Sequence, residues 1–417
     1  MKNRYLALLI VLVLAFGVTL GAVGCGGDEE TTTTTEEEGA TETTEADGET
    51  TTTLSEEPSG DPIKVGAILS LTGPYAGLGE PEKNTIEMLV ERVNSNGGIN
   101  GRPLEVIIED DATESAQTVA AASKLIDREE VVAIIGATGT GQSMAFREQV
   151  VAAEIPNVSI GGGTPITNPL SPWVFQTPWS NNIVVPFTLD YVQSKGISKV
   201  AIIADSGGFA QDGAATVEKF LPDYDIEVVA QETFEPGDTD MTAQLTSIKG
   251  SDAEAVLMWS AGSGAAVVAK NMNALEMDIP LFGSHGNARR ELIEGAGAGG
   301  EGFRFAAGKV LVPESYGTDS EGYKVASQFI ADYVARYGGP PDTFAGHAYD
   351  ALMITVEAMR RLDADFTPQE LRDEIEATSG FVGIGGTFTY SADDHNGMTV
   401  DDLVMYEVKD GAWKLAE

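Results

Sequence analysis

Two glycine-rich turns carry the residue types best suited to binding a small anion. Gly136–Gln142 follows an apolar segment and opens a predicted helix, and Gly161–Pro165 follows the next apolar segment. Glycines let backbone N–H groups approach a ligand, and a helix N-terminus carries partial positive charge. Thr138 and Thr140 add hydroxyl donors to the first turn. Either turn alone is also explained as a tight connection that needs small residues, but two such turns together favour a site for a carboxylate or another small anion.

Motifs for catalysis and cofactor binding are missing from the sequence. The first turn has neither the G-x-G-x-x-G spacing of a dinucleotide site nor the lysine of a P-loop. There is no G-x-S-x-G or H-E-x-x-H segment, and the three histidines are widely spaced. The paired acids Asp110–Asp111 and Asp393–Asp394 are interpreted as loop or cap residues. We therefore predict a binding protein that is not an enzyme and that carries no cofactor and no metal.

Three aromatic side chains are candidates to stack on a ligand. Tyr75 lies in the turn after the first predicted strand, Trp259 ends a predicted strand, and Trp179 sits just after the expected first crossover. For each of them, packing in a core is the competing interpretation. His347 and His395 are interpreted as structural or exposed residues.

The elements that position these residues alternate between strand and helix. Strands are predicted at 63–69, 104–108, 131–135 and 158–160, and helices at 81–96, 115–128 and 141–153. A second run has strands at 199–204, 226–229, 255–259 and 281–282, and helices at 212–221, 241–249 and 265–273. Strands that are apolar throughout indicate parallel sheets covered on both faces. The two runs predict an α/β fold of two doubly wound lobes.

The rest of the chain is predicted to be mainly helical, at 320–337, 345–362 and 368–378, with strands at 386–390 and 403–408. A chain that fills one lobe, then the other, and then returns must cross between them more than once. We predict one lobe from 61–180 with 310–390 and the other from 181–309 with 391–417. Such crossings form a hinge with a cleft, where small ligands bind.

The N-terminus has the layout of an export signal. Lys2 and Arg4 precede an apolar stretch, and small residues lead up to Cys25, the single cysteine. A small residue before a lone cysteine resembles a bacterial lipobox, so we predict that 1–24 is a lipoprotein signal peptide and that Cys25 is lipidated. An uncleaved signal anchor is the alternative, because 6–23 is close to membrane-spanning length. Both interpretations place the rest of the chain outside the cytoplasm at a membrane surface.

Residues 25–60 are predicted to be a disordered tether, since Thr and Glu dominate and almost no apolar side chain is available for a core. The formal net charge of the chain is -40, and the part after the tether carries most of it. Such a charge repels phosphates, so nucleic acid is not expected as a partner.

Several segments resemble the branched-chain amino-acid (Leu/Ile/Val) binding proteins, the type I extracytoplasmic solute receptors of ABC importers. They are 64–79, 96–104, Asp110–Asp111, 282–286 and 345–352. They follow the family order from about residue 62 to residue 410. The resemblance implies two α/β lobes joined by three crossovers, with a small-molecule ligand between them.

The resemblance also implies roles for individual residues. The loops matching Thr138–Gly141 and Gly161–Thr164 grip a carboxylate in the family, and Thr140 falls at a hydroxyl position. Gly163 stands where a second hydroxyl is usual, so Thr164 or a backbone N–H supplies that contact. Aromatic positions of the family match Phe209 and Phe344. The predicted ligand-binding residues are Tyr75, Thr138, Gly139, Thr140, Gly161, Gly163, Thr164, Phe209, Trp259, His285 and Phe344.

His285 stands where amino-acid binders of this family carry an acidic residue that pairs with the ligand ammonium. An ammonium ion taken out of water needs a compensating charge, which a neutral imidazole does not supply. We therefore predict a carboxylate without an amine, such as an aromatic or short organic acid, or a neutral amide. The alternative is that His285 is structural and that another acidic side chain supplies the charge.

The function predicted on these grounds is that of a lipid-anchored, monomeric solute receptor that delivers its ligand to an ABC permease and ATPase complex. A ligand sensor of the same fold with a separate signalling partner is the alternative.

Overall fold

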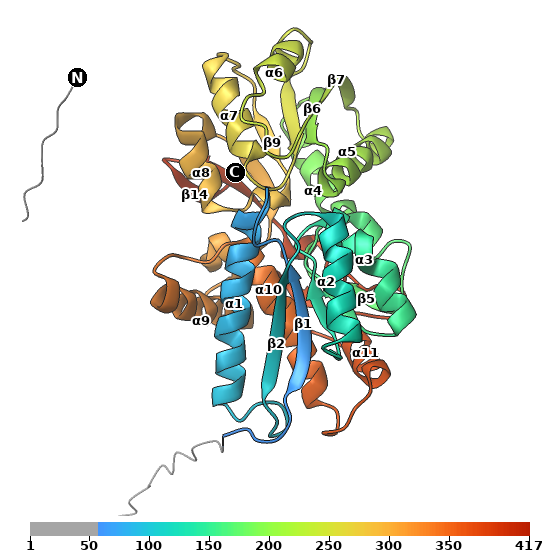
Figure 1. Ribbon diagram of the computed structural model, residues 1–417. Helices are drawn as coiled ribbons and strands as arrows, with labels where there is room; N and C mark the ends of the chain where they lie inside the picture. The colour runs from blue at the N-terminus through green and yellow to red at the C-terminus, as the bar shows by residue number, and fades with distance from the viewer. Residues whose placement is uncertain (1–56) are drawn as a thin grey trace, which may run out of the picture. The chain divides into compact units, whose positions relative to one another are not determined.

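The computed structural model describes residues 57–417 (Figure 1). The predicted signal peptide, Cys25 and all but the last residues of the predicted tether lie outside the described residues. Across 57–417, every helix is too short or too polar to cross a membrane.

The first sheet is parallel and has the strand order β2-β1-β3-β4-β5. Its strands are β1 (Ile63–Leu69), β2 (Leu104–Asp110), β3 (Ile134–Gly136), β4 (Asn157–Ser159) and β5 (Val174–Gln176). The helices between them are α1 (Ala76–Ser95), α2 (Ser115–Asp127) and α3 (Thr140–Ala153). β1 pairs with β2 along its whole length and is almost completely buried, as expected when helices cover both faces of a sheet.

The second sheet has the order β14-β13-β10-β9-β8-β6-β7. Its parallel part consists of β6 (Lys199–Asp205), β7 (Glu227–Phe234), β8 (Ala255–Trp259), β9 (Leu281–Gly283) and β10 (Arg304–Ala307). The antiparallel strands β13 (Val404–Lys409) and β14 (Ala412–Leu415) extend one edge. The accompanying helices are α4 (Asn181–Ser194), α5 (Gly208–Phe220), α6 (Thr242–Lys249), α7 (Gly264–Ala274) and α8 (Arg290–Ala296).

The chain passes between the two sheets three times. It leaves the first sheet after β5 and returns after β10, where α9 (Glu321–Tyr337), α10 (Thr343–Arg360) and α11 (Pro368–Glu376) follow. α10 packs along α1 of the first lobe, beside it in Figure 1. After the hairpin of β11 (Phe381–Val382) and β12 (Thr387–Phe388), the chain crosses again to β13. The predicted fold of two α/β lobes with parallel sheets is confirmed, and the exact lobe boundaries stay a prediction.

The first helix differs from its prediction. Proline suits the first position of a helix, so the pattern placed the start at Pro81. The structure begins α1 at Ala76, because the N–H groups of Leu78 and Gly79 already donate to the Tyr75 carbonyl at 2.8 and 3.1 Å. The end of the turn after β1 is therefore helical, and Tyr75 stands at the helix N-cap.

Candidate functional site

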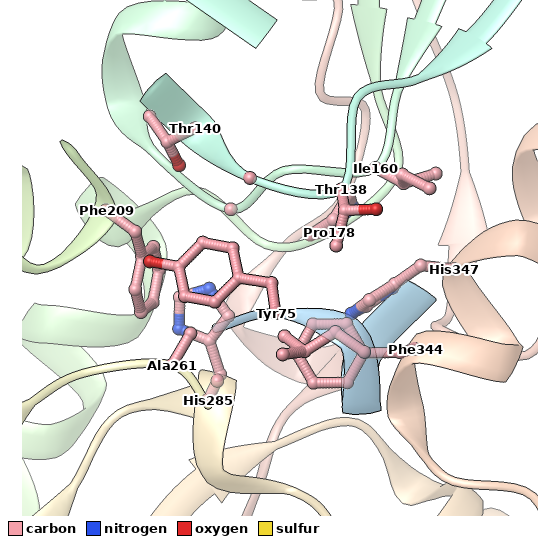
Figure 2. A pocket seen from close by; sticks show the side chains of 14 residues that line it. Tyr75, Thr138, Thr140, Ile160, Pro178, Phe209, Ala261, His285, Phe344 and His347 are labelled. Atoms are coloured by element: carbon pink, nitrogen blue, oxygen red, sulfur yellow. The ribbon is translucent and has the colours of Figure 1, made fainter. Parts of the chain in front are cut away.

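A cavity lies between the two lobes and receives side chains from both (Figure 2). The empty space between its walls amounts to about 390 Å³, a volume that includes solvent at the open side of the cavity. Its lining residues are Tyr75, Leu78, Thr138, Gly139, Thr140, Ile160, Gly162, Pro178, Phe209, Ala261, His285, Gly286, Phe344 and His347.

The first glycine-rich turn reaches the cavity through Thr138, Gly139 and Thr140. The Thr138 hydroxyl is committed inside the first lobe, since it donates to Glu82 Oε2 at 2.6 Å and accepts the Ser70 N–H at 3.0 Å. Thr140 is the first residue of α3, and its buried hydroxyl has no hydrogen-bond partner among the described residues. Of the two predicted hydroxyl donors, Thr140 is therefore the one available to a ligand.

The second glycine-rich turn contacts the cavity through Gly162. The carbonyls of Gly161 and Gly163 accept Gln176 Nε2 at 2.8 and 3.1 Å, and both residues lie behind the cavity wall. Thr164 also lies outside the wall, where its N–H donates to Asp212 Oδ2 of α5 at 2.8 Å. The structure brings Gly162 to the cavity wall and leaves Gly161, Gly163 and Thr164 outside it, so ligand contacts of these three residues stay predictions.

Three aromatic rings form apolar walls. Tyr75 at the start of α1, Phe209 on α5 and Phe344 on α10 all line the cavity, as Figure 2 shows. Trp259 does not line it, because its Nε1 donates to Asn181 Oδ1 at 2.9 Å inside the second lobe. Its stacking on a ligand stays a prediction that this position does not support. Trp179 is also buried outside the wall.

Two histidines face the cavity from different lobes. His285 opens the 3-10 helix after β9, and neither of its ring nitrogens has a partner with hydrogen-bond geometry among the described residues. His347 comes from α10 and is buried, with 3% of its surface exposed. Its Nδ1 has no hydrogen-bond partner among the described residues. Burial lowers the pKa of each imidazole to about 3; the Trp179 backbone opposes this effect at His285, and the nearby His285 adds to it at His347. Both imidazoles are therefore neutral at physiological pH.

Sequence reasoning missed seven lining residues, and among them His347 is the polar side chain; the others are Leu78, Ile160, Gly162, Pro178, Ala261 and Gly286. A signal was present, because His347 follows Phe344 by three positions and so shares its face of a helix. His395, in contrast, is a structural residue. Its Nδ1 lies 2.9 Å from the Val174 carbonyl and its Nε2 lies 3.1 Å from Glu376.

No acidic side chain lines the cavity among residues 57–417. The acids behind the wall have other roles. Glu82 bonds Thr138, and Asp205 Oδ1 accepts the Gly207 N–H at 2.8 Å. Burial raises the pKa of both carboxyl groups, which disfavours their charged forms.

The lobes touch where aromatic rings of one meet glycines of the other. A Cβ atom on Gly162 would lie 2.5 Å from His285 Nε2 and 3.1 Å from the Phe209 ring. In the reverse direction, a Cβ atom on Gly207 would lie 3.0 Å from the Tyr75 hydroxyl. The two lobes are therefore closed on each other, because they approach so tightly at these glycines that a methyl side chain would collide with the opposite lobe.

Comparison with known proteins agrees with this architecture. The sequence profile described as "Periplasmic binding protein" matches residues 62–412. The Leu/Ile/Val-binding protein homolog 7 of Brucella suis is 23% identical over 372 residues, which cover 81% of this chain and 88% of the relative. The leucine-, isoleucine-, valine-, threonine-, and alanine-binding protein of Pseudomonas aeruginosa is 22% identical, covering 76% of this chain and 83% of that protein.

Solved structures are similar over the same region. An extracellular ligand-binding receptor from Rhodopseudomonas palustris HaA2 has a TM-score of 0.81 at 25% identity, covering 86% of this chain and 100% of the receptor. The branched-chain amino acid transporter substrate binding protein LivJ from Streptococcus pneumoniae, in complex with isoleucine, has a TM-score of 0.76 at 26% identity. That match covers 86% of this chain and 99% of LivJ.

Proposed function

The chain belongs to the periplasmic binding protein family, and from this premise we propose that it is the lipid-anchored solute receptor of an ABC importer. Members of the family are extracytoplasmic substrate-binding proteins and not enzymes. The transport role is supported by the relatives named as Leu/Ile/Val-binding proteins and by the resemblance to a transporter's substrate binding protein. The sequence around Cys25 supports the anchor, which would hold the receptor near the permease.

We propose that the ligand is a small carboxylate or amide held in the interlobe cavity. The observation that carries this proposal is the buried Thr140 hydroxyl, which has no partner among the described residues and stands at the N-terminus of α3. A hydroxyl and exposed N–H groups at a helix N-terminus are good donors to a carboxylate or carbonyl oxygen. The rings of Tyr75, Phe209 and Phe344 would cover the apolar part of the ligand.

We propose further that the ligand carries no ammonium group. A buried ammonium ion needs a paired negative charge, and an unpaired one costs several kcal/mol or more. The described part of the cavity wall offers neutral His285 and His347 in place of a carboxylate. Glu82 and Asp205, the acids behind the wall, each accept a bond within their own lobe through one oxygen, and Glu82 Oε1 and Asp205 Oδ2 have no hydrogen-bond partner among the described residues. Burial raises the pKa of both carboxyl groups, so neither favours the charged form that an ammonium ion needs.

A thermal-shift screen of the mature protein against amino acids, aromatic acids, short fatty acids and amides tests the ligand class. The proposal expects acids or amides without an amine to raise the melting temperature. A rise with branched-chain amino acids alone would show that the interpretation of His285 is wrong. Cell fractionation of Cys25→Ser tests the anchor, since loss of the lipid should release the receptor from the membrane fraction.

A further inference from the structure

Four buried polar atoms of the cavity wall have no hydrogen-bond partner among the described residues. They are Thr140 Oγ1, both ring nitrogens of His285, and His347 Nδ1. They come from three elements and from both lobes, so local chain geometry does not bring them together. Leaving a buried polar atom unpaired costs about 1–3 kcal/mol, so four such atoms around one cavity point to a bound molecule that pairs with them.

We propose that His347 and His285 together recognise a hydroxyl group, so that the ligand is a short hydroxy acid whose carboxylate binds at Thr140. This inference rests on the proposed function and names the substrate class for the same cavity. Neither the matched profile nor the similar proteins assign a role to His347.

The chemistry of the two imidazoles favours a hydroxyl. A neutral imidazole has one N–H donor and one acceptor nitrogen, and a hydroxyl both donates and accepts. One ring can therefore accept the hydroxyl proton, while the other donates its N–H to the hydroxyl oxygen. An ammonium group has three donors and no acceptor, so it leaves the imidazole N–H groups unpaired and its own charge uncompensated.

Both rings are oriented by packing. The Phe209 ring meets His285 edge to face, with centroids 5.0 Å apart. His347 packs in the same way against Trp179 at 5.4 Å and against Phe344 at 6.0 Å. Aromatic packing holds the planes of both rings. Figure 2 shows the two histidines approaching the cavity from different sides, with a His347 nitrogen toward its interior.

The narrowness of the cavity limits the length of the acid. The cavity volume open to water is only about 30 Å³. That room corresponds to one or two water molecules, so the closed lobes suit a ligand of a few heavy atoms. Propionate, lactate and 3-hydroxypropionate are therefore suitable probes, because they differ only in the presence and position of one hydroxyl.

Calorimetric titration of the mature protein with these three acids tests the inference. We expect one hydroxy acid to bind at least tenfold more tightly than propionate. His347→Leu should remove this preference, so that the hydroxy acid and propionate bind this variant with affinities within about threefold of each other. His347→Asn, which keeps a polar group near the Nδ1 position, should retain part of it. The matched control is Phe344→Leu, which trims an apolar wall and should weaken all three acids equally.

The outcomes separate this inference from the proposed function. If propionate binds but the hydroxyl gives no advantage, or if His347→Leu keeps the full preference, the role of His347 is wrong and the receptor function stands. If neither these acids nor any longer acid or amide binds, the proposed ligand class is wrong as well. Thermal melting of the unliganded variants shows whether each one is folded.

Discussion

The backbone N–H of Thr164 in the first lobe donates to the carboxylate of Asp212 in the second lobe at 2.8 Å. The same Asp212 oxygen accepts Asn181 Nδ2 at 2.7 Å, and Asn181 Oδ1 accepts Trp259 Nε1 at 2.9 Å. Asn181, Asp212 and Trp259 all belong to elements of the second lobe, whereas Thr164 follows the turn that carries Gly162. The Thr164–Asp212 bond therefore joins the lobes in the closed arrangement and must break when they separate.

We expect Asp212→Ala to weaken ligand binding without any contact to the ligand. A hydrogen bond to a charged acceptor contributes about 1.5–3 kcal/mol, so loss of the interlobe bond should speed ligand dissociation by roughly tenfold or more. Stopped-flow measurement of the dissociation rate checks this. The control is Asp223→Ala, an exposed acid after α5. Equal dissociation rates for both variants and the wild type would show that the bond does not stabilise closure.

Gly162→Ala should obstruct closure. The added Cβ would lie 2.5 Å from His285 Nε2, which is shorter than real Cβ contacts, and the Phe209 ring stands on the same side. We expect ligand affinity to fall at least tenfold, while the melting temperature of the unliganded protein changes little because the lobes can stay apart. Gly339→Ala is the matched control, since its Cβ meets no atom within 4 Å. Unchanged affinity in Gly162→Ala would mean that the lobes close differently around a ligand.

The two threonines of the first turn should respond differently to substitution. Thr140→Ala removes a donor proposed to bind the carboxylate, so we expect a loss of affinity of about 1–2 kcal/mol and near-normal stability, with Thr140→Ser retaining binding. Thr138→Ala leaves Glu82 buried without its 2.6 Å donor, so we expect a lower melting temperature. Titration calorimetry and thermal melting of both variants separate the two effects. A loss of affinity in Thr138→Ala with normal binding in Thr140→Ala would reverse the assignment.

The buried histidines should destabilise the protein in acid. The folded pKa values of His285 and His347 are about 3, below the usual value of 6.5, so below pH 6.5 the unfolded chain binds more protons than the folded chain. The contribution of these neutral histidines to the free energy of unfolding is therefore complete above pH 6.5 and is lost as the pH falls toward 3. At pH 4 each histidine accounts for a loss of up to about 3 kcal/mol.

Urea unfolding at pH 7 and pH 4 measures this loss. His347→Leu should narrow the stability difference between the two pH values, because one of the two titrating groups is gone. A difference as large as in the wild type would show that His347 is not buried in its neutral form.

Regular features of the sequence were sufficient for the fold. The apolar strand at Ile63–Leu69 and the later repeats predict two parallel sheets, and the two glycine-rich turns mark the cleft. The predicted ends of helices were less accurate where they depended on a single residue. For example, α1 starts five residues before Pro81. Propensity at Pro81 was overridden by hydrogen bonds that Tyr75 accepts.

The composition of the cavity wall was predicted only in part. His347 enters the cavity because α10 packs on α1, and its spacing from Phe344 indicates a shared helix face without showing that this face reaches the cavity. Trp259 and Thr138 looked like ligand contacts, yet each has a buried partner from a distant segment, Asn181 and Glu82. A tryptophan or a threonine at these positions is compatible with either a ligand contact or a structural hydrogen bond, and only the tertiary packing distinguishes the two roles.

The central claim is that the interlobe cavity binds a small organic acid and rejects the amino acid of the same carbon skeleton. Calorimetric titration of the mature protein with lactate, propionate and alanine, and with 4-methylpentanoate and leucine, tests it most directly. We expect at least one acid to bind and its amino-acid counterpart to give no measurable heat at the same concentration. Tight binding of leucine or alanine, with no binding of the matching acids, would contradict the account.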